Sequence, residues 1–299
     1  MKNPYLNDEF FSILETQALQ LKKELTGYFG GKHLTKSYGQ TVEFADYREY
    51  MLGDDIRRID WNLYSRFEKY FLKLFTDERQ MQVDIYIDCS ASMGKVIPAK
   101  GQYVVALAAG LGFLAVHNTD RVSFKFIRNE RIENNTGVIV GKSAFFRALQ
   151  TLDAQEFSGD SFISEAVLNE RDGGKRNGLS VIVSDFLTDN DWKKAVDLFC
   201  FNGRQALVVQ VLAKEEVSPS YTGRMHLIDS EAEDLFDGKN MRMRVTGALQ
   251  KAYDRACRAI REDIREFCAA RGVGFVSLST EIPIRKAIFQ ELMKVGLLV

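Results

Sequence analysis

From Val83 to the C-terminus, apolar segments that suit β-strands alternate with segments that suit helices. Strands are predicted at residues 83–87, 121–127, 179–184, 206–212 and 273–278. Helices are predicted at residues 98–117, 143–152, 162–168, 191–201, 247–270 and 284–294. Such alternation builds right-handed crossovers between parallel strands. We therefore predict an α/β fold with a mostly parallel open sheet and helices on both faces, in which ligands bind beyond the carboxyl ends of the strands.

The first 80 residues follow a different pattern. Apolar residues at helical spacing between Phe10 and Leu25 predict an amphipathic helix. Residues 32–80 are rich in arginine, aspartate and aromatic residues and lack a long regular period, so we predict short strands and turns there. We expect residues 1–80 to form an N-terminal segment packed on a main domain of residues 81–299.

Composition and charge argue against several classes of function. Hydrophobic residues make up 45% of the chain, charged residues 27%, and the net charge is -1, which is typical of a globular protein without a nucleic-acid partner. The longest apolar run, from Val104 to Val116, is too short for a membrane span and predicts a buried helix. The N-terminus has no apolar signal core, so we expect a cytoplasmic protein.

A loop of oxygen-bearing side chains follows the first predicted strand. Asp88, Ser90 and Ser92 occupy alternate positions at the carboxyl end of that strand. One carboxylate and two hydroxyls are hard oxygen ligands of the kind that Mg²⁺ prefers. A simpler interpretation is a strand-end aspartate followed by serines that only cap a helix.

Two further loops carry oxygen ligands. Ser161 precedes the helix predicted at 162–168, and Asp185 follows the strand predicted at 179–184. If the strands before Asp88 and Asp185 are neighbours in a parallel sheet, all three loops meet in one crevice. This convergence favours the metal interpretation of the first loop.

The order Asp-x-Ser-x-Ser, then Ser or Thr, then Asp resembles the metal-ion-dependent adhesion site of von Willebrand factor A domains. The resemblance implies a Rossmann-like sheet and a bound Mg²⁺ or Mn²⁺. The ligand set that it implies is Asp88, Ser90, Ser92, Ser161 and Asp185. Two positions depart from the family, because Ser161 stands where Thr is usual and Phe186 stands where many relatives have Gly. In such domains a partner protein's carboxylate fills the open metal position, which implies a binding module and not an enzyme.

A second signature lies upstream, in the segments Glu43-Phe44, Arg48-Glu49-Tyr50, Gly53 to Trp61 and Ser65-Arg66. It resembles the bacterial domain of unknown function 58 family, whose members carry E-F, R-x-Y, G-D-D-x-R-x-I-D-W and A-R ahead of D-x-S-x-S. The positions that carry the resemblance are Glu43, Arg48, Gly53, Asp54, Asp55, Arg57, Asp60, Trp61 and Arg66. Because this family is characteristically encoded beside MoxR-type AAA+ ATPases, the resemblance implies such an ATPase as partner.

The arginines of this signature allow three interpretations. Interleaved carboxylates, including Asp54, Asp55 and Asp60, nearly cancel the arginine charge. We therefore favour an arginine–carboxylate network that joins the segment to the main domain. A surface that docks a partner and a nucleic-acid surface, with Trp61 and Tyr64 beneath bases, are the alternatives.

Three functions are compatible with the sequence. The first is a metal-dependent adaptor or co-chaperone that works with a MoxR-type ATPase in assembling or remodelling protein complexes. The second is a metal-dependent phosphoryl hydrolase with Asp88 as nucleophile, although Ser90 stands where the haloacid-dehalogenase type needs a second aspartate. The third is a scaffold with a non-functional metal site. We favour the first, because the combined resemblance implies it and no histidine-based catalytic cluster is evident. The chain lacks a phosphate-binding G-x-x-x-x-G-K-[ST] loop, so any ATP-driven work would come from a partner.

Overall fold

The structure is a computed structural model in which two compact units can be distinguished. It describes residues 3–28, 42–51, 54–77, 80–94, 97–170, 178–217, 219, 223–227 and 241–292. The main unit comprises Met1–Gln20 and Met81–Val299, and the second unit comprises Leu21–Gln80. Thus a boundary does fall near residue 80, but the N-terminal residues group with the main unit. The reason is that Phe10, Phe11 and Leu14 are buried in its core.

The main unit is built on a six-stranded sheet with the order β10-β7-β6-β3-β4-β5. The strands are β3 (Gln82–Asp88), β4 (Arg121–Arg128), β5 (Arg131–Asn135), β6 (Gly178–Ser184), β7 (Gln205–Leu212) and β10 (Gly274–Ser279). All neighbours are parallel except β5, which pairs antiparallel with β4 at one edge. The predicted α/β class and mostly parallel sheet are confirmed. The polar edge strand β5 was not predicted, because it has no apolar face to give a strand pattern.

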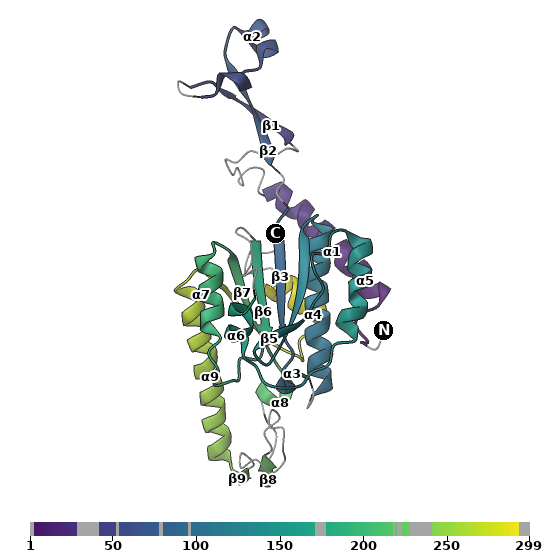
Figure 1. The fold of residues 1–299 in the computed structure, drawn as a ribbon, viewed down its shortest axis with the longest axis vertical. Helices are drawn as coiled ribbons and strands as arrows, with labels where there is room; N and C mark the ends of the chain where they lie inside the picture. The colour runs from purple at the N-terminus through teal and green to yellow at the C-terminus, as the bar shows by residue number, and fades with distance from the viewer. Residues whose placement is uncertain are drawn as a thin grey trace. The chain divides into compact units, whose positions relative to one another are not determined.

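Helices cover both faces of the sheet (Figure 1). One face carries α1 (Asp8–Tyr28), α4 (Pro98–His117) and α5 (Lys142–Asp153), and the other carries α6 (Ile163–Leu168), α7 (Lys193–Phe201) and α9 (Gly247–Ala269). Shorter helices are α3 (Ala91–Gly94), α8 (Lys214–Val217), α10 (Ile284–Lys286) and the π-helix η2 (Ala287–Leu292). Successive residues of β3 point to opposite faces, so Ile85 and Ile87 join one hydrophobic cluster while Tyr86 joins the other.

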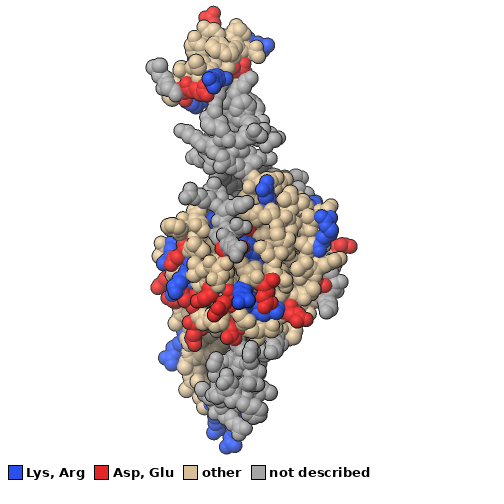
Figure 2. Space-filling view, in the orientation of Figure 1, with Lys and Arg blue, Asp and Glu red and all other residues tan. Residues whose placement is uncertain are grey.

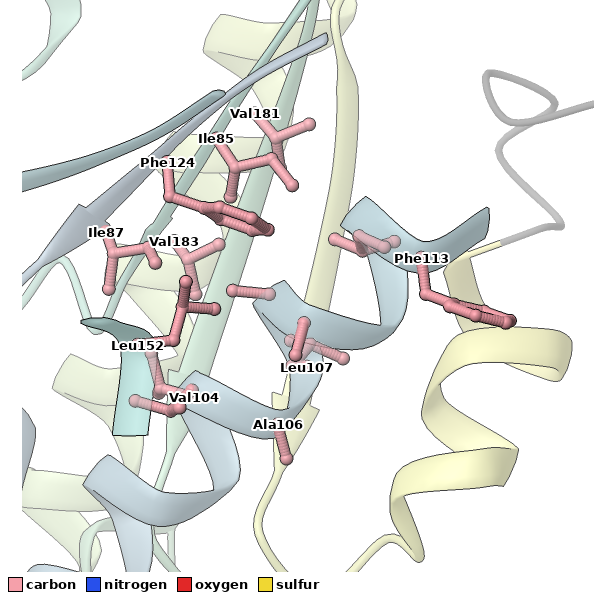
Figure 3. Packing of buried hydrophobic residues seen from close by; sticks show 14 of the residues in the cluster. Ile85, Ile87, Val104, Ala106, Leu107, Phe113, Phe124, Leu152, Val181 and Val183 are labelled. Atoms are coloured by element: carbon pink, nitrogen blue, oxygen red, sulfur yellow. The ribbon is translucent and has the colours of Figure 1, made fainter. Parts of the chain in front are cut away.

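Helix α4 is the central helix of the first cluster, and its bounds match the predicted helix. Figure 3 shows Val104 and Leu107 of α4 packed among residues of the sheet, including Phe124. This helix is long and apolar enough to cross a membrane, but 89% of its apolar stretch is buried inside the protein. A Cβ atom at Gly112 would overlap the Phe124 ring, so glycine lets the helix approach the sheet closely.

Two antiparallel strand pairs complete the described structure. In the second unit, β1 (Val42–Glu49) pairs with β2 (Phe71–Asp77), and η1 (Ile56–Arg58) and α2 (Trp61–Phe67) lie between them in the chain. In the main unit, β8 (Gly223–Leu227) pairs with β9 (Met241–Val245). Helix α2 falls where only short strands and turns were predicted. Asp60 begins it by accepting hydrogen bonds from the backbone N–H groups of Asn62 and Leu63.

Candidate functional site

The strand order brings the three predicted metal loops to one end of the sheet. β3 lies between β4 and β6, so the loops after β3 and β6 are neighbours. The loop that contains Ser161 contacts both of them, because Ala91 N donates to Gly159 O at 2.9 Å and Asn190 Nδ2 donates to Ser161 O at 2.8 Å. In Figure 1 this end of the sheet is marked by the labels of α3 and α8.

Asp88 lies at the centre of the site and is fully buried, with 0% exposure. Its Oδ1 accepts a hydrogen bond from Ser90 N at 2.9 Å. Its Oδ2 accepts hydrogen bonds from the hydroxyls of Ser161 at 2.7 Å and Ser184 at 2.6 Å. The first and second predicted loops therefore meet at Asp88. Ser184, at the end of β6, was not among the predicted site residues.

The two serines of the first loop lie side by side. Ser90 Oγ and Ser92 Oγ are 3.2 Å apart, so their oxygen atoms can face a common point. Ser90 is buried, whereas Ser92 is partly exposed. Solvent therefore reaches the site on the side of Ser92.

Asp185, the third-loop carboxylate, is held by protein donors of its own. Its Oδ1 accepts a hydrogen bond from Leu187 N at 3.0 Å, and its Oδ2 lies 2.7 Å from Lys100 Nζ. Lys100 comes from the first turn of α4 and also contacts Glu216 of α8 at 2.8 Å. Neither residue was predicted. The signal for Lys100 was a cationic residue near the start of an otherwise apolar buried helix, and Glu216 gave no signal.

The charges of the site are unevenly compensated. Burial raises the pKa of Asp88, and the negative charge of Asp185 raises it further, while the hydrogen bonds from Ser184, Ser90 and Ser161 act in the opposite direction. Among the residues that the structure describes, no lysine, arginine or histidine forms an ion pair with Asp88. Within the described part of the chain, the carboxylate is thus hydrogen-bonded but has no contacting positive charge.

Lys100 has the opposite environment. Burial by itself would lower the pKa of Lys100, but the charges of Asp185 and Glu216 outweigh burial and raise that pKa. Burial also raises the pKa of Glu216, against the effect of Lys100. Two carboxylates contact the one ammonium group, and Asp88 lies beside the charge of Asp185, so a divalent cation would balance the charge that remains when all three carboxylates are ionised.

The donor set fits a hard divalent cation. Asp88, Ser90 and Ser92 offer a carboxylate and two hydroxyls within one turn of chain, and such oxygen ligands suit Mg²⁺ or Mn²⁺. Ser161 and Asp185 would support the site from the second and third loops. Across the described part of the chain, no three His, Cys, Asp or Glu side chains are grouped to hold an ion, so a cation here would depend on the serine hydroxyls.

Phe186 shows how the third loop accommodates a bulky residue where a glycine was expected from the family pattern. Its φ angle is 54°, in the left-handed region that glycine adopts without strain. The side chain is 3% exposed and packs edge-to-face on Trp192 at a ring distance of 4.9 Å. Phe186 therefore points into the core and does not crowd the loop, and the cost falls on the backbone, about 1–3 kcal/mol for such strain.

The upstream signature forms the second unit, and its charged residues are mostly exposed. Arg48 pairs with Asp54 at 2.8 Å, and Asp55 accepts a hydrogen bond from Arg57 N at the start of η1. Arg57, Trp61 and Arg66 are exposed, while Asp60 is buried. The side chain of Glu43 and the whole of Gly53 lie outside the described residues.

Within this unit Arg57 and Arg66 form no part of a buried cluster, and the network that joins the segment to the main domain stays a prediction. The Arg48–Asp54 ion pair and the Asp60 cap of α2 are among the described contacts of the charged residues of this unit.

Acidic and basic side chains lie beside one another on the visible face of the main unit, as Figure 2 shows. This mixture agrees with the near-zero net charge of the chain.

The fold and site together define an α/β domain with a cluster of carboxylate and hydroxyl side chains beyond the carboxyl ends of its strands. The sequence matches the family described as "Protein of unknown function DUF58" over residues 46–263. The chain belongs to this family, as the two sequence signatures implied.

Relatives and solved structures show similarity of different extents. Uncharacterized proteins of Mycobacterium bovis and Mycobacterium tuberculosis are 26% identical over 275 residues, which cover 90% of this chain and 84% of theirs. A von Willebrand factor type A structure from Catenulispora acidiphila is 13% identical and covers 48% of this chain and 35% of that chain, with a TM-score of 0.34. The pilus adhesin SpaC from Lactobacillus rhamnosus GG, in its open conformation, is 9% identical and covers 75% of this chain and 30% of that chain, with a TM-score of 0.41. Because both TM-scores are low, the fold rests on the sheet order itself.

Proposed function

We propose that this protein is a metal-dependent protein-interaction module. Asp88, Ser90 and Ser92 would hold Mg²⁺ or Mn²⁺, with Ser161 and Asp185 in support, and an acidic residue of a partner protein would complete the coordination. A cation held by few protein carboxylates stays electrophilic and attracts an anionic ligand. The protein would then act as a binding partner and not as an enzyme.

One observation carries this proposal. Asp88 is fully buried among hydroxyl and amide donors, beside the negative charge of Asp185, and none of the described lysine, arginine or histidine side chains contacts it. Burying a carboxylate in this way is costly unless a positive charge compensates it. A divalent ion at the adjacent hydroxyls of Ser90 and Ser92 would supply that charge.

The proposed partner is a MoxR-type AAA+ ATPase. Two observations support this partner. The chain belongs to the family whose resemblance implied such an ATPase, and the sequence has no phosphate-binding G-x-x-x-x-G-K-[ST] loop of its own. Any ATP-driven step would then come from the partner. The protein would serve as an adaptor or co-chaperone that presents a metal-borne docking site during assembly or remodelling of a complex, and we propose that it does so in the cytoplasm.

A scaffold role is the second candidate, and a specific observation favours it. Both oxygens of Asp88 and both oxygens of Asp185 already accept hydrogen bonds from the protein. The loops could therefore persist as hydrogen-bonded turns. The phosphoryl hydrolase is less well supported, because a nucleophile at Asp88 would be fully buried with both oxygens engaged.

Mn²⁺ binding separates these candidates. We would titrate the protein with Mn²⁺ and follow the free ion by electron paramagnetic resonance, for wild type, Asp88→Asn and the control Asp120→Asn. Asp120 accepts a hydrogen bond from Met81 N at 2.8 Å, before the start of β3, so it is a carboxylate outside the site. We expect one Mn²⁺ per chain in wild type and control and none in Asp88→Asn. Equal binding by all three would contradict the proposed site.

The partner is tested with purified proteins. A MoxR-type ATPase from the same organism would be passed over immobilised wild type in Mg²⁺, wild type in EDTA, and Asp88→Asn in Mg²⁺. We expect retention in the first case alone. Retention in all three would move the interface to another surface, such as the second unit, and leave the metal loops with a scaffold role.

A further inference from the structure

Lys100, in the first turn of α4, places a positive charge beside the loops of the proposed metal site. It is 0% exposed, although a lysine is almost never fully buried unless it is paired. Its ammonium group lies 2.7 Å from Asp185 Oδ2 and 2.8 Å from Glu216 Oε1, and it donates to Ser92 O at 3.3 Å. Through these three contacts Lys100 touches the first and third loops of the proposed metal site.

The position of this ammonium affects any ion at the site. Its charge is fixed next to one of the two predicted ligand carboxylates, and it contacts the backbone of Ser92, whose hydroxyl is a predicted ligand. Like charges repel strongly in a buried environment, where the effective dielectric constant is far below that of water. A divalent ion that enters beside Asp88 therefore meets both the attraction of the carboxylates and the repulsion of Lys100.

Glu216 offsets part of that repulsion. It lies in α8 at the end of β7, its Oε1 pairs with Lys100, and its Oε2 accepts a hydrogen bond from Ala213 N at 2.7 Å. Helix α9 supports this segment, because the Tyr253 hydroxyl donates to Glu216 O at 2.8 Å. The charge of Glu216 is thus held at a fixed place beside the ammonium group.

We propose that Lys100 and Glu216 set the divalent-ion affinity of this site in opposite directions. Lys100 lowers the affinity by placing a permanent positive charge against Asp185, and Glu216 raises it by compensating that charge. The inference rests on the proposed function, and it explains what these two residues do for it. A free ion is therefore bound less tightly than it would be without Lys100, and the additional negative charge of a partner's carboxylate strengthens its binding. Metal binding and partner binding are thereby coupled.

The test compares ion affinity in variants that differ by one charge. Because Lys100→Met alone leaves Asp185 and Glu216 without their shared cation, it is destabilising. The decisive comparison is therefore Glu216→Gln against Glu216→Gln/Lys100→Met, in which the second change removes only the ammonium group from an otherwise identical site. Mn²⁺ alone is the probe, titrated at constant ionic strength and followed by electron paramagnetic resonance and by calorimetry.

A matched control comes from a second buried lysine. Lys125 is 5% exposed and pairs with Glu170 at 2.6 Å, but it contacts neither Asp88 nor Asp185. Lys125→Met in the Glu216→Gln background repeats the loss of a buried ammonium group away from the loops. Circular dichroism melts of all variants show which of them are folded at the temperature of the titration.

We expect Glu216→Gln to bind Mn²⁺ about tenfold more weakly than wild type, and Glu216→Gln/Lys100→Met to bind about tenfold or more tightly than Glu216→Gln, each tenfold step being about 1.4 kcal/mol. The Lys125 control should match Glu216→Gln. Equal affinities in Glu216→Gln and the double variant would overturn the role of Lys100 while leaving the metal site intact. If no folded variant binds Mn²⁺, the proposed function and this inference both fail.

Discussion

Two aspartates on the same face of β3 are buried to nearly the same degree, yet their surroundings differ. Asp84 is 4% exposed and lies 2.7 Å from the guanidinium group of Arg204, and Ser123 Oγ donates to it at 2.6 Å. Lys125 Nζ lies 3.9 Å away. Asp88 is surrounded by hydroxyl and amide donors, without a contacting cation among the described residues.

The comparison separates a structural ion pair from a candidate binding site. At Asp84 the protein supplies the compensating charge, so the cluster is complete without a ligand. At Asp88 the protein supplies hydrogen bonds and places a second carboxylate nearby, which increases the demand for positive charge. Burial alone does not distinguish the two aspartates. The source of the positive charge does.

The largest expected effect comes from breaking the complete cluster. Arg204→Met would leave the buried Asp84 without its main partner and would also remove the hydrogen bond to Ser180 Oγ. We expect the free energy of unfolding to fall by about 3–5 kcal/mol. Urea denaturation measures this loss, and Arg271→Met, which breaks an exposed pair with Asp197, should cost less than about 1 kcal/mol. Equal losses would remove the distinction between buried and exposed pairs.

Substitutions of Asp88 should lower the stability by less, and the alanine and asparagine variants should differ in how much they lose. Asp88→Ala leaves three donors without an acceptor, so we expect a loss of about 1–3 kcal/mol in the metal-free protein. Because Asp88 is fully buried, its loss affects stability as well as any metal binding. Asp88→Asn keeps an acceptor and removes the uncompensated charge, so it should cost less than alanine. An asparagine variant that is less stable than the alanine variant would contradict this account.

The ionisation of Asp88 predicts how the stability of the protein depends on pH. The pKa of Asp88 in the folded protein is raised above its ordinary value of 3.8. The stability that protonated Asp88 contributes is therefore fully present below pH 3.8 and is lost as the pH rises through the folded-state pKa. Without metal, the stability of wild type relative to Asp88→Asn should fall over this interval in urea melts. Saturating Mg²⁺ at neutral pH should restore the lost stability of wild type. If the difference in stability between wild type and Asp88→Asn changes with neither pH nor Mg²⁺, Asp88 carries no uncompensated charge.

Sequence patterns located the main elements and the loops of the site, for a physical reason. A central parallel strand is apolar on both faces, so β3, β6 and β7 stand out as continuous hydrophobic runs, and the residues just after such strands meet at one edge. The contacts of Asp88 with Ser90 and Ser161 follow from that geometry. The polar edge strand β5 has no such pattern and could not be found in this way.

The partners of the third loop could not be predicted, because they depend on side chains that only tertiary packing brings together. Lys100 and Glu216 are 116 positions apart in the sequence and meet through one ion pair. A lysine at the start of a helix is usually solvated, and a glutamate in a short helix is unremarkable. Phe186 is a further case, since the packing of its ring on Trp192 outweighs the backbone preference that favours glycine there.

A third kind of buried aspartate extends the comparison to the second unit, with the smallest expected effects. Asp60 is 6% exposed, and it accepts hydrogen bonds from the N–H groups at the start of α2 and from the Tyr47 hydroxyl at 3.1 Å. Its charge is favoured by the helix N-terminus.

We expect Asp60→Ala to lower the free energy of unfolding of this unit by about 1 kcal/mol, the usual cost of a lost N-cap. Arg57→Ala, at an exposed position, should change it by less than about 0.5 kcal/mol. Thermal melts of the full chain with hydrogen exchange of the α2 amides measure both, and a larger loss for Arg57 than for Asp60 would support the predicted arginine network.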